Sequence, residues 1–223
     1  MKAIILIPAY NEARAIEKVI QQLQDAEFKD ILVVNDGSED RTGALAEKMG
    51  IQVVHHLINR GLGGALGTGL QAAVLSGADY IVSFDADGQH QVEDIKKVLA
   101  PLEKGTADMV IGSRLMDPEG MPWSRRLFNR LANLLTFCLF HIWVTDSQSG
   151  LRGFTRQAAQ AIEIQTNRME VSSEFIREIK DKNLRLEQVP IEAVYTPYSL
   201  SKGQSMGVGL KTFYKLILYK FMN

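Results

Sequence analysis

Two aspartates, Asp85 and Asp87, are separated by a single alanine directly after an apolar run over residues 80–84. In an extended chain, residues two apart point to the same side, so these two carboxylates would converge on one point. A hard cation such as Mg²⁺ or Mn²⁺ would relieve their repulsion and keep positions open for substrate phosphates, and the Gln89 carbonyl is a candidate third oxygen ligand. The alternative is a solvated acidic turn, because aspartate and glycine are common turn residues.

A second acidic turn, Asp36-Gly37-Ser38, follows the apolar run over residues 31–34. Asp-Gly is a strong hairpin signal, but the segment that follows is predicted to be helical, which argues against a hairpin. Asp36 is then left at a strand end, where its carboxylate can accept hydrogen bonds from a nucleotide base or ribose. The residues expected to cap the following helix are Ser38, Asp40 and Thr42.

Glycine is concentrated further along the chain, at Gly61, Gly63, Gly64, Gly67 and Gly69. Residues 67–72 even satisfy the dinucleotide-binding pattern G-x-G-x-x-A. That pattern belongs in the tight turn between a strand and a helix, whereas these residues fall inside a predicted helix, so we interpret the match as false. The glycines instead predict close approach of the backbone to a ligand or a packed neighbour, with plain packing of a helix on a sheet as the alternative.

Short apolar runs separated by helical patterns make up the first half of the chain. The predicted strands are residues 4–7, 31–34, 51–54, 80–84 and 109–111, and the predicted helices lie around residues 16–23, 62–75 and 95–102. This alternation predicts an α/β fold, a Rossmann-like and mostly parallel sheet flanked by helices on both faces. Ligands of such sheets bind beyond the carboxyl ends of the strands, where Asp36, Asn59 and Asp85 would stand.

The alternation stops after Gly112. A basic and aromatic segment spans residues 114–144, and a polar cluster over residues 146–150 follows it. A helix is expected around residues 173–181, an alternating strand over residues 189–195, and an amphipathic helix over residues 210–221. The length is ordinary for one α/β core, so we predict a single domain over residues 1–223.

Composition and charge exclude several classes of protein. The 223 residues are 46% hydrophobic and 23% charged, and the net charge of −1 gives no general attraction to nucleic acid or to anionic lipid. The single cysteine, Cys138, excludes an internal disulfide framework, and its apolar surroundings predict a core or interface residue. The amino terminus lacks a signal-peptide cleavage site, and residues 131–144 would rise only about 21 Å as a helix, too short for a bilayer. We therefore expect a cytoplasmic protein.

Five motifs, in one order, carry a resemblance to a known family. They are Ile-Pro-Ala-Tyr-Asn-Glu at 7–12, Val-Asn-Asp-Gly-Ser-Glu-Asp-Arg-Thr at 34–42, Asn-Arg-Gly-Leu-Gly at 59–63, Asp-Ala-Asp-Gly-Gln-His at 85–90 and Gly-Ser-Arg at 112–114. Over roughly residues 3–155 the sequence resembles the family 2 glycosyltransferases of the GT-A fold. Within them it is similar to the dolichol-phosphate mannosyltransferase-like, or polyprenyl-phosphate glycosyltransferase, branch.

The resemblance implies roles by position. The nucleotide-sugar would be bound by residues of the first half, 1–112: Pro8, Tyr10, Asn11, Glu12, Asp36, Ser38, Asn59, Gly64, Asp85, Ala86 and Asp87. The implied ligands of a divalent cation, Mg²⁺ or Mn²⁺, are Asp85, Asp87 and Gln89. Arg114 and Asp146 would be catalytic, with Asp146 the candidate general base. The acceptor-side half, 113–223, would bind the acceptor through Arg114, Arg126, Arg130, Ser149 and Lys202.

The implied reaction is inverting transfer of a sugar from GDP-mannose or a UDP-hexose to a polyprenyl or dolichyl phosphate. Arg126 and Arg130 lie four residues apart, so one helix face would offer both guanidiniums to a phosphate while neighbouring aromatic residues meet acyl chains. A basic surface helix over a core is the alternative. Many members of this branch carry carboxy-terminal transmembrane helices, whereas residues 210–221 form one amphipathic segment, so we expect peripheral contact with the inner face of the membrane.

Three rival hypotheses stay open. The acceptor could be a soluble or cell-envelope sugar instead of a lipid phosphate. The glycine cluster could belong to a dinucleotide-dependent oxidoreductase, or the chain could be a nucleotide-binding module without turnover. Nucleic acid is not an expected partner. No motif identifies the sugar, the base or the acceptor, because pocket shape decides these.

Overall fold

A seven-stranded sheet forms the centre of the structure, a computed structural model that describes residues 1–119, 121–167, 170–192 and 194. The strands lie in the order β3-β2-β1-β4-β6-β5-β7. Their bounds are β1 Ala3–Ala9, β2 Ile31–Asn35, β3 Gln52–His55, β4 Tyr80–Ser83, β5 Met109–Ser113, β6 Arg152–Thr155 and β7 Leu186–Pro190. β6 is antiparallel to both of its neighbours, and the other pairings are parallel. The predicted α/β class and mostly parallel sheet are confirmed.

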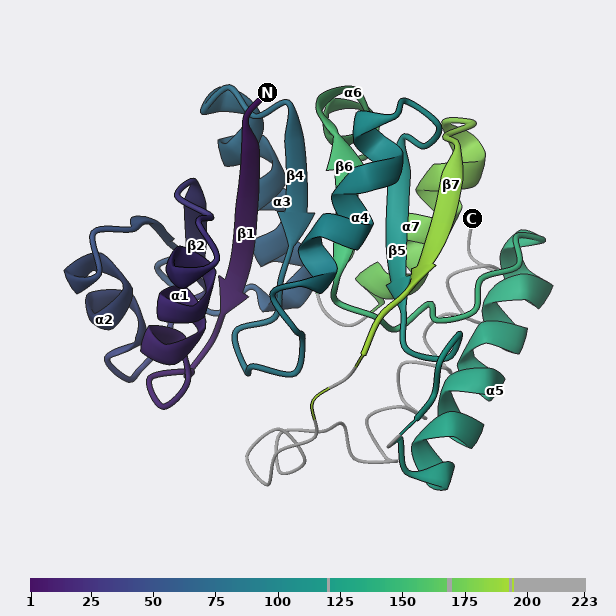
Figure 1. Cartoon of the computed structure of the whole chain (residues 1–223), viewed down its shortest axis with the longest axis horizontal. Helices are drawn as coiled ribbons and strands as arrows, with labels where there is room; N and C mark the ends of the chain where they lie inside the picture. Colours follow the sequence, from purple (N-terminus) through teal and green to yellow (C-terminus); the bar gives the residue numbers. More distant parts are fainter. Residues whose placement is uncertain (120, 168–169, 193, 195–223) are drawn as a thin grey trace.

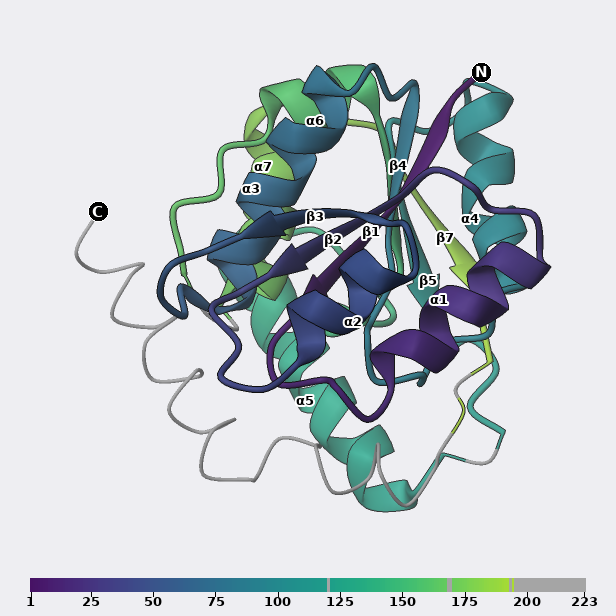
Figure 2. The same cartoon turned by 90° about the vertical axis from the view of Figure 1, so that its left-hand side faces the viewer.

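Helices cover both faces of the sheet because its central strands are apolar on both sides. One face carries α1 Ile16–Asp25, α2 Thr42–Lys48 and α4 Asp94–Glu103, and the other carries α3 Gly61–Leu75, α6 Arg156–Ala161 and α7 Val171–Asp181 (Figure 2). Alternate residues of β1 divide between these layers. Ile5 and Ile7 pack in the core with residues of α1 and α4, while Ile4 and Leu6 pack in the core with residues of α3 and α7.

The parallel strands end at a common edge of the sheet, where the loops that carry the predicted site residues meet. Figure 1 shows the arrowheads of β1, β5 and β7 at the lower edge, with β6 running in the opposite direction. The long helix α5, Trp123–Phe140, lies beside this edge, after β5 in the chain (Figure 1). The fold therefore places a separate helix next to the crevice in which ligands of parallel sheets bind.

The second half of the chain departs from the predicted elements. β6 matches no predicted strand, because its sequence Arg-Gly-Phe-Thr contains neither an apolar run nor a clear alternation. The strand predicted over residues 189–195 lies earlier in the structure, where β7 covers Leu186–Pro190. Its backbone pairing with β5 begins at Leu186 and does not depend on apolar alternation. β3 begins and ends one residue later than predicted. Lys202 and the amphipathic stretch 210–221 lie outside the described residues.

The side chains of α5 have an inverted distribution of polarity. Its two buried side chains, Asn133 and Thr136, are polar. Its large exposed side chains are apolar: Trp123, Leu127, Phe128, Leu131, Leu134 and Phe137. Cys138 is also exposed, so of the two positions predicted for this cysteine, core or interface, the core position is wrong. No helix in the part of the chain that the structure describes combines the length and the apolar character needed to cross a bilayer.

The crowded glycines of α3 serve close packing. A Cβ atom on Gly69 would overlap the side chain of Leu6 on β1, and a Cβ atom on Gly63 would overlap the backbone carbonyl of Thr166. By contrast, a Cβ atom on Gly67 would meet Ile164 at 3.6 Å, an ordinary van der Waals contact. Gly67 and Gly69 lie inside α3 and not in the turn before it. The helix-on-sheet alternative therefore accounts for Gly69, and a packed neighbour accounts for Gly63.

These contacts predict opposite effects for two neighbouring substitutions. Gly69→Ala should lower the free energy of unfolding by about 1–3 kcal/mol, because the added methyl group overpacks the core against Leu6. Gly67→Ala should leave stability unchanged or raise it by up to about 1 kcal/mol, because alanine favours the helix and the space is open. Urea denaturation of both variants checks this, and equal destabilisation by the two would contradict it.

Candidate active site

The Asp85 carboxylate lies where two distant segments of the chain meet. His90 approaches it, with Nε2 2.8 Å from Oδ2 of Asp85. The backbone of Gly150 packs directly on the same carboxylate, since a Cβ atom on Gly150 would overlap its oxygens. Gly150 is held in turn by the Ser83 hydroxyl, which donates to its carbonyl at 2.7 Å. The acidic loop after β4 and the polar cluster over residues 146–150 thus form one site.

Buried cations compensate the charge of Asp85. Burial acts to raise the pKa of Asp85, but the contact with His90 and the charges of Arg114 and Arg152 outweigh burial, so the pKa lies below its usual value. Arg152, on β6, is itself buried, and this burial lowers its pKa to about 10 although the charges of Asp85 and Asp146 oppose the shift. Its guanidinium donates to the Ser147 carbonyl at 2.8 Å. Asp85 is therefore a stable anion.

Asp87 has the opposite electrostatic environment. Burial, followed by the negative charge of Asp85, raises the pKa of Asp87 to about 6. Two groups of Gln89 donate to this carboxylate, the backbone N–H at 3.0 Å and the side-chain Nε2 at 2.6 Å. They offset only part of the repulsion. Asp87 is ionised at neutral pH at a cost in free energy, and a bound cation would remove that cost.

The residues present fit a hard divalent cation with open coordination positions. Asp85 and Asp87 supply carboxylate oxygens, the ligands that Mg²⁺ and Mn²⁺ prefer. Within the described ranges, no group of three or more His, Cys, Asp and Glu side chains is arranged to enclose a metal ion. Substrate phosphates and water are further ligands that such a cation commonly takes. The backbone carbonyl of Gln89, the predicted third ligand, accepts a hydrogen bond from the Val194 N–H at 2.8 Å.

Unsatisfied polar atoms gather around this point. The described residues contain buried side-chain atoms without a hydrogen-bond partner at His90 Nδ1, Ser149 Oγ and Arg152 Nε. His90 and Arg152 act electrostatically on Asp85, and Ser149 precedes Gly150, whose backbone packs on Asp85. Such groups are rare in folded proteins because each costs free energy, and they are expected where a ligand binds.

Arg114 and Asp146 form a buried ion pair next to Asp85. The Arg114 guanidinium donates through Nε to Oδ2 of Asp146 at 2.7 Å and through Nη2 to Oδ1 at 2.9 Å, and its backbone N–H donates to Oδ2 at 3.0 Å. The Asp146 side chain is fully buried, whereas that of Arg114 is 14% exposed. Both oxygens of Asp146 are therefore directed at Arg114, and the pair presents a cation to the crevice.

A hollow of about 270 Å³ lies between the carboxyl ends of β1 and β2 and the start of α3. Pro8, Tyr10, Asp36 and Asn59, which the resemblance assigns to the nucleotide, are among the residues that line it. Asp36 is buried and already engaged: it accepts hydrogen bonds from the backbone N–H groups of Arg60 at 2.9 Å and Gly61 at 2.7 Å. The structure therefore gives Asp36 an anchoring contact with the loop before α3 on the wall of this hollow.

His56 completes the anchor at Asp36. Its Nδ1 lies 2.6 Å from Oδ1 of Asp36, and its Nε2 lies 3.0 Å from the Thr68 hydroxyl on α3. Both side chains are buried. The loops after β2 and β3 and the helix α3 are thereby joined around one histidine.

The other predicted nucleotide residues mostly connect neighbouring loops. The Asn11 N–H donates to the Ser38 hydroxyl at 3.0 Å, and the Glu12 N–H donates to the Thr42 hydroxyl at 2.8 Å. Ser38 and Thr42 thus bridge to the loop after β1 and do not cap α2, so that prediction is wrong for both. Asp40 does accept from the first-turn N–H of Thr42, at 2.9 Å.

Four further residues belong to the predicted site: Ala86, Gly64, Arg126 and Arg130. Ala86 is buried between the two aspartates. The Gly64 N–H donates to the Asn167 carbonyl at 3.4 Å, so this group contacts a distant segment of the chain. Arg126 donates to the carbonyls of Met121, at 2.9 Å, and Pro118. Arg130 is exposed on α5. Because Arg126 binds these carbonyls, the two guanidiniums do not form the paired phosphate site expected from their spacing.

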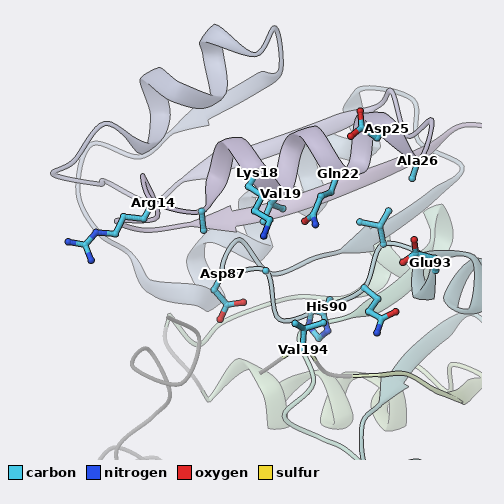
Figure 3. A pocket seen from close by; sticks show the side chains of 14 residues that line it. Arg14, Lys18, Val19, Gln22, Asp25, Ala26, Asp87, His90, Glu93 and Val194 are labelled. Carbon is cyan, nitrogen blue, oxygen red and sulfur yellow. The ribbon is translucent and has the colours of Figure 1, made fainter. Parts of the chain in front are cut away.

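A groove of about 710 Å³, lined by both polar and apolar side chains, opens beside Asp87, between α1 and the loop after β4. Figure 3 shows Lys18 and Gln22 pointing from α1 toward this loop, with Asp87 and His90 on the opposite wall. Arg14 stands at the same end of the groove as Asp87 (Figure 3). The groove gives Asp87 access to solvent, and Arg14 and Lys18 place positive charge along its lining.

Comparison with known proteins identifies the family. The sequence profile of the family described as "Glycosyl transferase family 2" matches residues 4–163. The chain belongs to the family 2 glycosyltransferases. An uncharacterised protein of Methanocaldococcus jannaschii is 44% identical over 221 residues, which cover 97% of this chain and 91% of that protein. A UDP-N-acetylglucosamine–dolichyl-phosphate N-acetylglucosaminyltransferase of Methanococcus voltae is 36% identical over 238 residues, covering 97% and 95%.

Solved structures share the fold of this glycosyltransferase. Glucosyl-3-phosphoglycerate synthase of Mycobacterium tuberculosis, in complex with phosphoglyceric acid, superimposes with a TM-score of 0.76 at 20% identity. The match covers 98% of this chain and 79% of that one. The predicted GT-A fold is thereby confirmed, and the family assignment agrees with the position of Gly67 and Gly69 inside a packed helix and not in a dinucleotide-binding turn.

Sequence reasoning missed three residues of this site. His90 belongs to a recognised motif, but nothing in its position indicates a contact with Asp85. Arg152 follows the polar cluster as a lone cation beside apolar residues, a pattern that signals a buried counter-ion only when the neighbouring acids are known. His56 precedes the glycine cluster without any motif. Its pairing with Asp36 joins residues twenty positions apart and depends on the parallel pairing of β2 and β3.

The electrostatics of Asp87 predict a site that is strained without metal. Because the pKa of Asp87 is raised to about 6 in the folded protein, ionised Asp87 lowers the free energy of unfolding above pH 6. As the pH falls from about 6 toward 4, Asp87 becomes protonated and this loss of stability disappears. In EDTA at pH 7.5, Asp87→Asn should raise the free energy of unfolding by about 1–3 kcal/mol, and this gain should shrink toward zero near pH 4. Urea denaturation across this range measures it.

Glu39→Gln is the matched control, since it removes an exposed carboxylate elsewhere in the loops. It should change stability little at any of these pH values. A gain for Asp87→Asn that did not depend on pH would contradict the electrostatic origin.

Proposed function

We propose that this glycosyltransferase moves a sugar from a nucleotide-sugar to a polyprenyl or dolichyl phosphate, with inversion and with a divalent cation, Mg²⁺ or Mn²⁺. The observation that carries the proposal is the packing of Gly150 on the Asp85 carboxylate. It brings the carboxylate pair, suited to a cation and a diphosphate, next to the Arg114–Asp146 pair, suited to an acceptor phosphate. Donor and acceptor chemistry can then meet at one point.

Names of relatives support both substrates. The Methanococcus voltae relative is named for UDP-N-acetylglucosamine and dolichyl phosphate. A polyprenol monophosphomannose synthase of Mycolicibacterium smegmatis is 32% identical over 174 residues, 73% of this chain and 65% of that protein. One structure of the mycobacterial synthase contains Mn²⁺ and UDP. Both names join a long-chain lipid to phosphate, while one contains N-acetylglucosamine and the other mannose, so the sugar has to be determined by experiment.

The chain's own residues suggest the steps of transfer. Asp85 and Asp87 would hold the cation, which supplies positive charge to the leaving nucleoside diphosphate. The hollow beside Tyr10 and Asn59 would receive the base, with its wall kept in place by Asp36 and His56. A phosphate oxygen of the acceptor attacks the anomeric carbon from the opposite face and the bond to the diphosphate breaks. Arg114 would hold that acceptor phosphate.

The ion pair also defines a role for Asp146. An acceptor phosphate is already ionised near neutral pH, so its attack needs no strong general base. Both oxygens of Asp146 are turned to Arg114, and its side chain is fully buried. We therefore assign Asp146 to the orientation of Arg114 instead of proton abstraction. This revises the role given by the resemblance.

Contact with a lipid surface is the third part of the proposal. The apolar side chains Leu127, Leu131 and Leu134 recur at helical spacing on α5 and are each about half exposed. Such a stripe beside the crevice can enter the interfacial layer of a membrane and bring the site to a lipid-borne phosphate. The contact would be at the surface of the membrane, and Arg130 could meet anionic headgroups there.

A donor screen tests the site assignment. Thermal stability is measured with GDP-mannose, UDP-glucose and UDP-N-acetylglucosamine, each with and without Mn²⁺, and transfer to a short polyprenyl phosphate is then assayed with the best donor. Asp87→Ala should abolish the metal-dependent stabilisation and lower kcat/KM by about a hundredfold or more, because the diphosphate loses its cation. Glu39→Gln should retain both. Unchanged metal-dependent transfer in Asp87→Ala would overturn the assignment.

A second measurement tests the lipid surface. Leu131→Asp should weaken co-sedimentation with vesicles containing anionic lipid by about tenfold or more, because an exposed apolar contact is replaced by a charge. Leu75→Asp is the matched control: Leu75 is an exposed leucine at the end of α3, on the edge of the sheet away from the crevice. It should change binding less than about twofold. Equal losses in the two variants would contradict a role for α5.

A further inference from the structure

The two side chains that α5 buries are both polar. Asn133 is 3% exposed and Thr136 is 1% exposed, although they lie on a helix whose large apolar side chains face outward. The Thr136 hydroxyl donates to the Ala132 carbonyl of its own helix at 2.9 Å and so makes no tie to another element. Asn133 differs, because its side chain reaches out of the helix.

The Asn133 carboxamide holds the backbone on both sides of Asp146. Its Nδ2 donates to the Thr145 carbonyl at 2.5 Å, and its Oδ1 accepts from the Ser147 N–H at 2.9 Å. One side chain thus fixes the peptide groups immediately before and after the buried aspartate. Since Asp146 in turn binds Arg114 through both oxygens, the position of the guanidinium depends on this clamp.

The far side of the same segment is held by the sheet. The Thr145 N–H donates to Oε1 of Gln188 on β7 at 2.6 Å, and the Thr145 hydroxyl lies 2.8 Å from the same oxygen and 2.7 Å from the Ser113 hydroxyl at the end of β5. Residues 145–147 therefore lie between two amide side chains, Gln188 from the sheet and Asn133 from α5. Only the second contact comes from the helix with the apolar outer face.

Asparagine is an informative choice at this position. It is a weak helix former, and a buried carboxamide costs free energy unless both of its ends are bonded. A leucine would pack equally well but bond neither peptide group. An aspartate could accept from Ser147 but would set a negative charge against the Thr145 carbonyl. The contact needs one donor and one acceptor on the same short side chain, which asparagine supplies.

We propose that Asn133 is a positioning residue that sets the Arg114–Asp146 pair for the acceptor and makes its geometry depend on the seating of α5. The inference rests on the proposed function in taking Arg114 as the group that binds the acceptor phosphate. A change in the position of α5, such as contact of its apolar face with lipid, moves Asn133 and with it the two peptide groups that flank Asp146. Asn133 acts through Asp146 and touches no substrate.

Steady-state kinetics of two Asn133 variants test the proposal. Asn133→Leu and Asn133→Asp should each lower kcat/KM for the polyprenyl phosphate at least tenfold, while KM for the nucleotide-sugar stays within twofold, because the clamp serves the acceptor half. Thr136→Val is the control, since it alters the next buried polar residue of the same helix without a contact to residues 145–147. It should stay within twofold in both parameters. An equal loss in Thr136→Val, or an equal rise in the donor KM, overturns the proposal.

A double variant tests whether the effect passes through Asp146. In an Asp146→Asn background, adding Asn133→Leu should lower kcat/KM by less than twofold further, because the group that Asn133 positions is already impaired. A further tenfold loss would mean that Asn133 acts by another route and would overturn the proposal.

Hydrogen exchange separates this inference from the proposed function. The Ser147 amide, which donates to Asn133, should exchange at least tenfold faster in Asn133→Leu than in the wild type and be unchanged in Thr136→Val. Unchanged exchange in Asn133→Leu overturns the clamp, whatever the reaction. If the wild type transfers no sugar to polyprenyl phosphate while exchange behaves as expected, the proposed function fails and the clamp on Asp146 stands.

Discussion

The site depends on the compensation of two neighbouring carboxylates, that of Asp146, which is fully buried, and that of Asp85, which is partly exposed. Charges removed from water are costly unless opposite charges and hydrogen bonds accompany them. His90 acts most strongly on Asp85, followed by the charges of Arg114 and Arg152. Arg114 also binds Asp146 directly, and the charge of Asp146 acts on Arg152. The antiparallel strand β6 runs between β4 and β5 and so places Arg152 close enough to Asp85 for their charges to interact.

Because the chain returns through β6, the acceptor segment contacts the acidic loop after β4 directly. Gly150 packs on Asp85 without a side chain between them, and Ser83, at the end of β4, holds the Gly150 carbonyl. The acceptor segment and the first carboxylate of the pair are therefore in direct contact. Asp87 lies two residues beyond Asp85, and the two aspartates are compensated unequally: the pKa of Asp85 is lowered, whereas that of Asp87 is raised.

The sequence predicts much of the first half because its signals are local. Apolar runs mark the strands, and polar residues directly after them, such as Asp36 and Asp85, must meet at one edge of a parallel sheet. The contacts that complete the site are not local. Ser83 and Gly150 are 67 positions apart, and β6 is too short and too polar to be predicted as a strand. The partner of Asp36, His56, becomes visible only once β2 and β3 are paired in register.

The geometry of the ion pair bears on the choice between acceptors. A sugar hydroxyl must lose a proton as it attacks, so its site needs a base with an oxygen or nitrogen turned toward the acceptor. Asp146, the residue suggested for that task, has both oxygens on Arg114 and none of its side chain exposed. A phosphate acceptor instead needs a fixed cation, which this pair supplies. The site therefore favours a phosphate over a sugar hydroxyl, and the exposed apolar stripe of α5 favours a phosphate carried by a lipid.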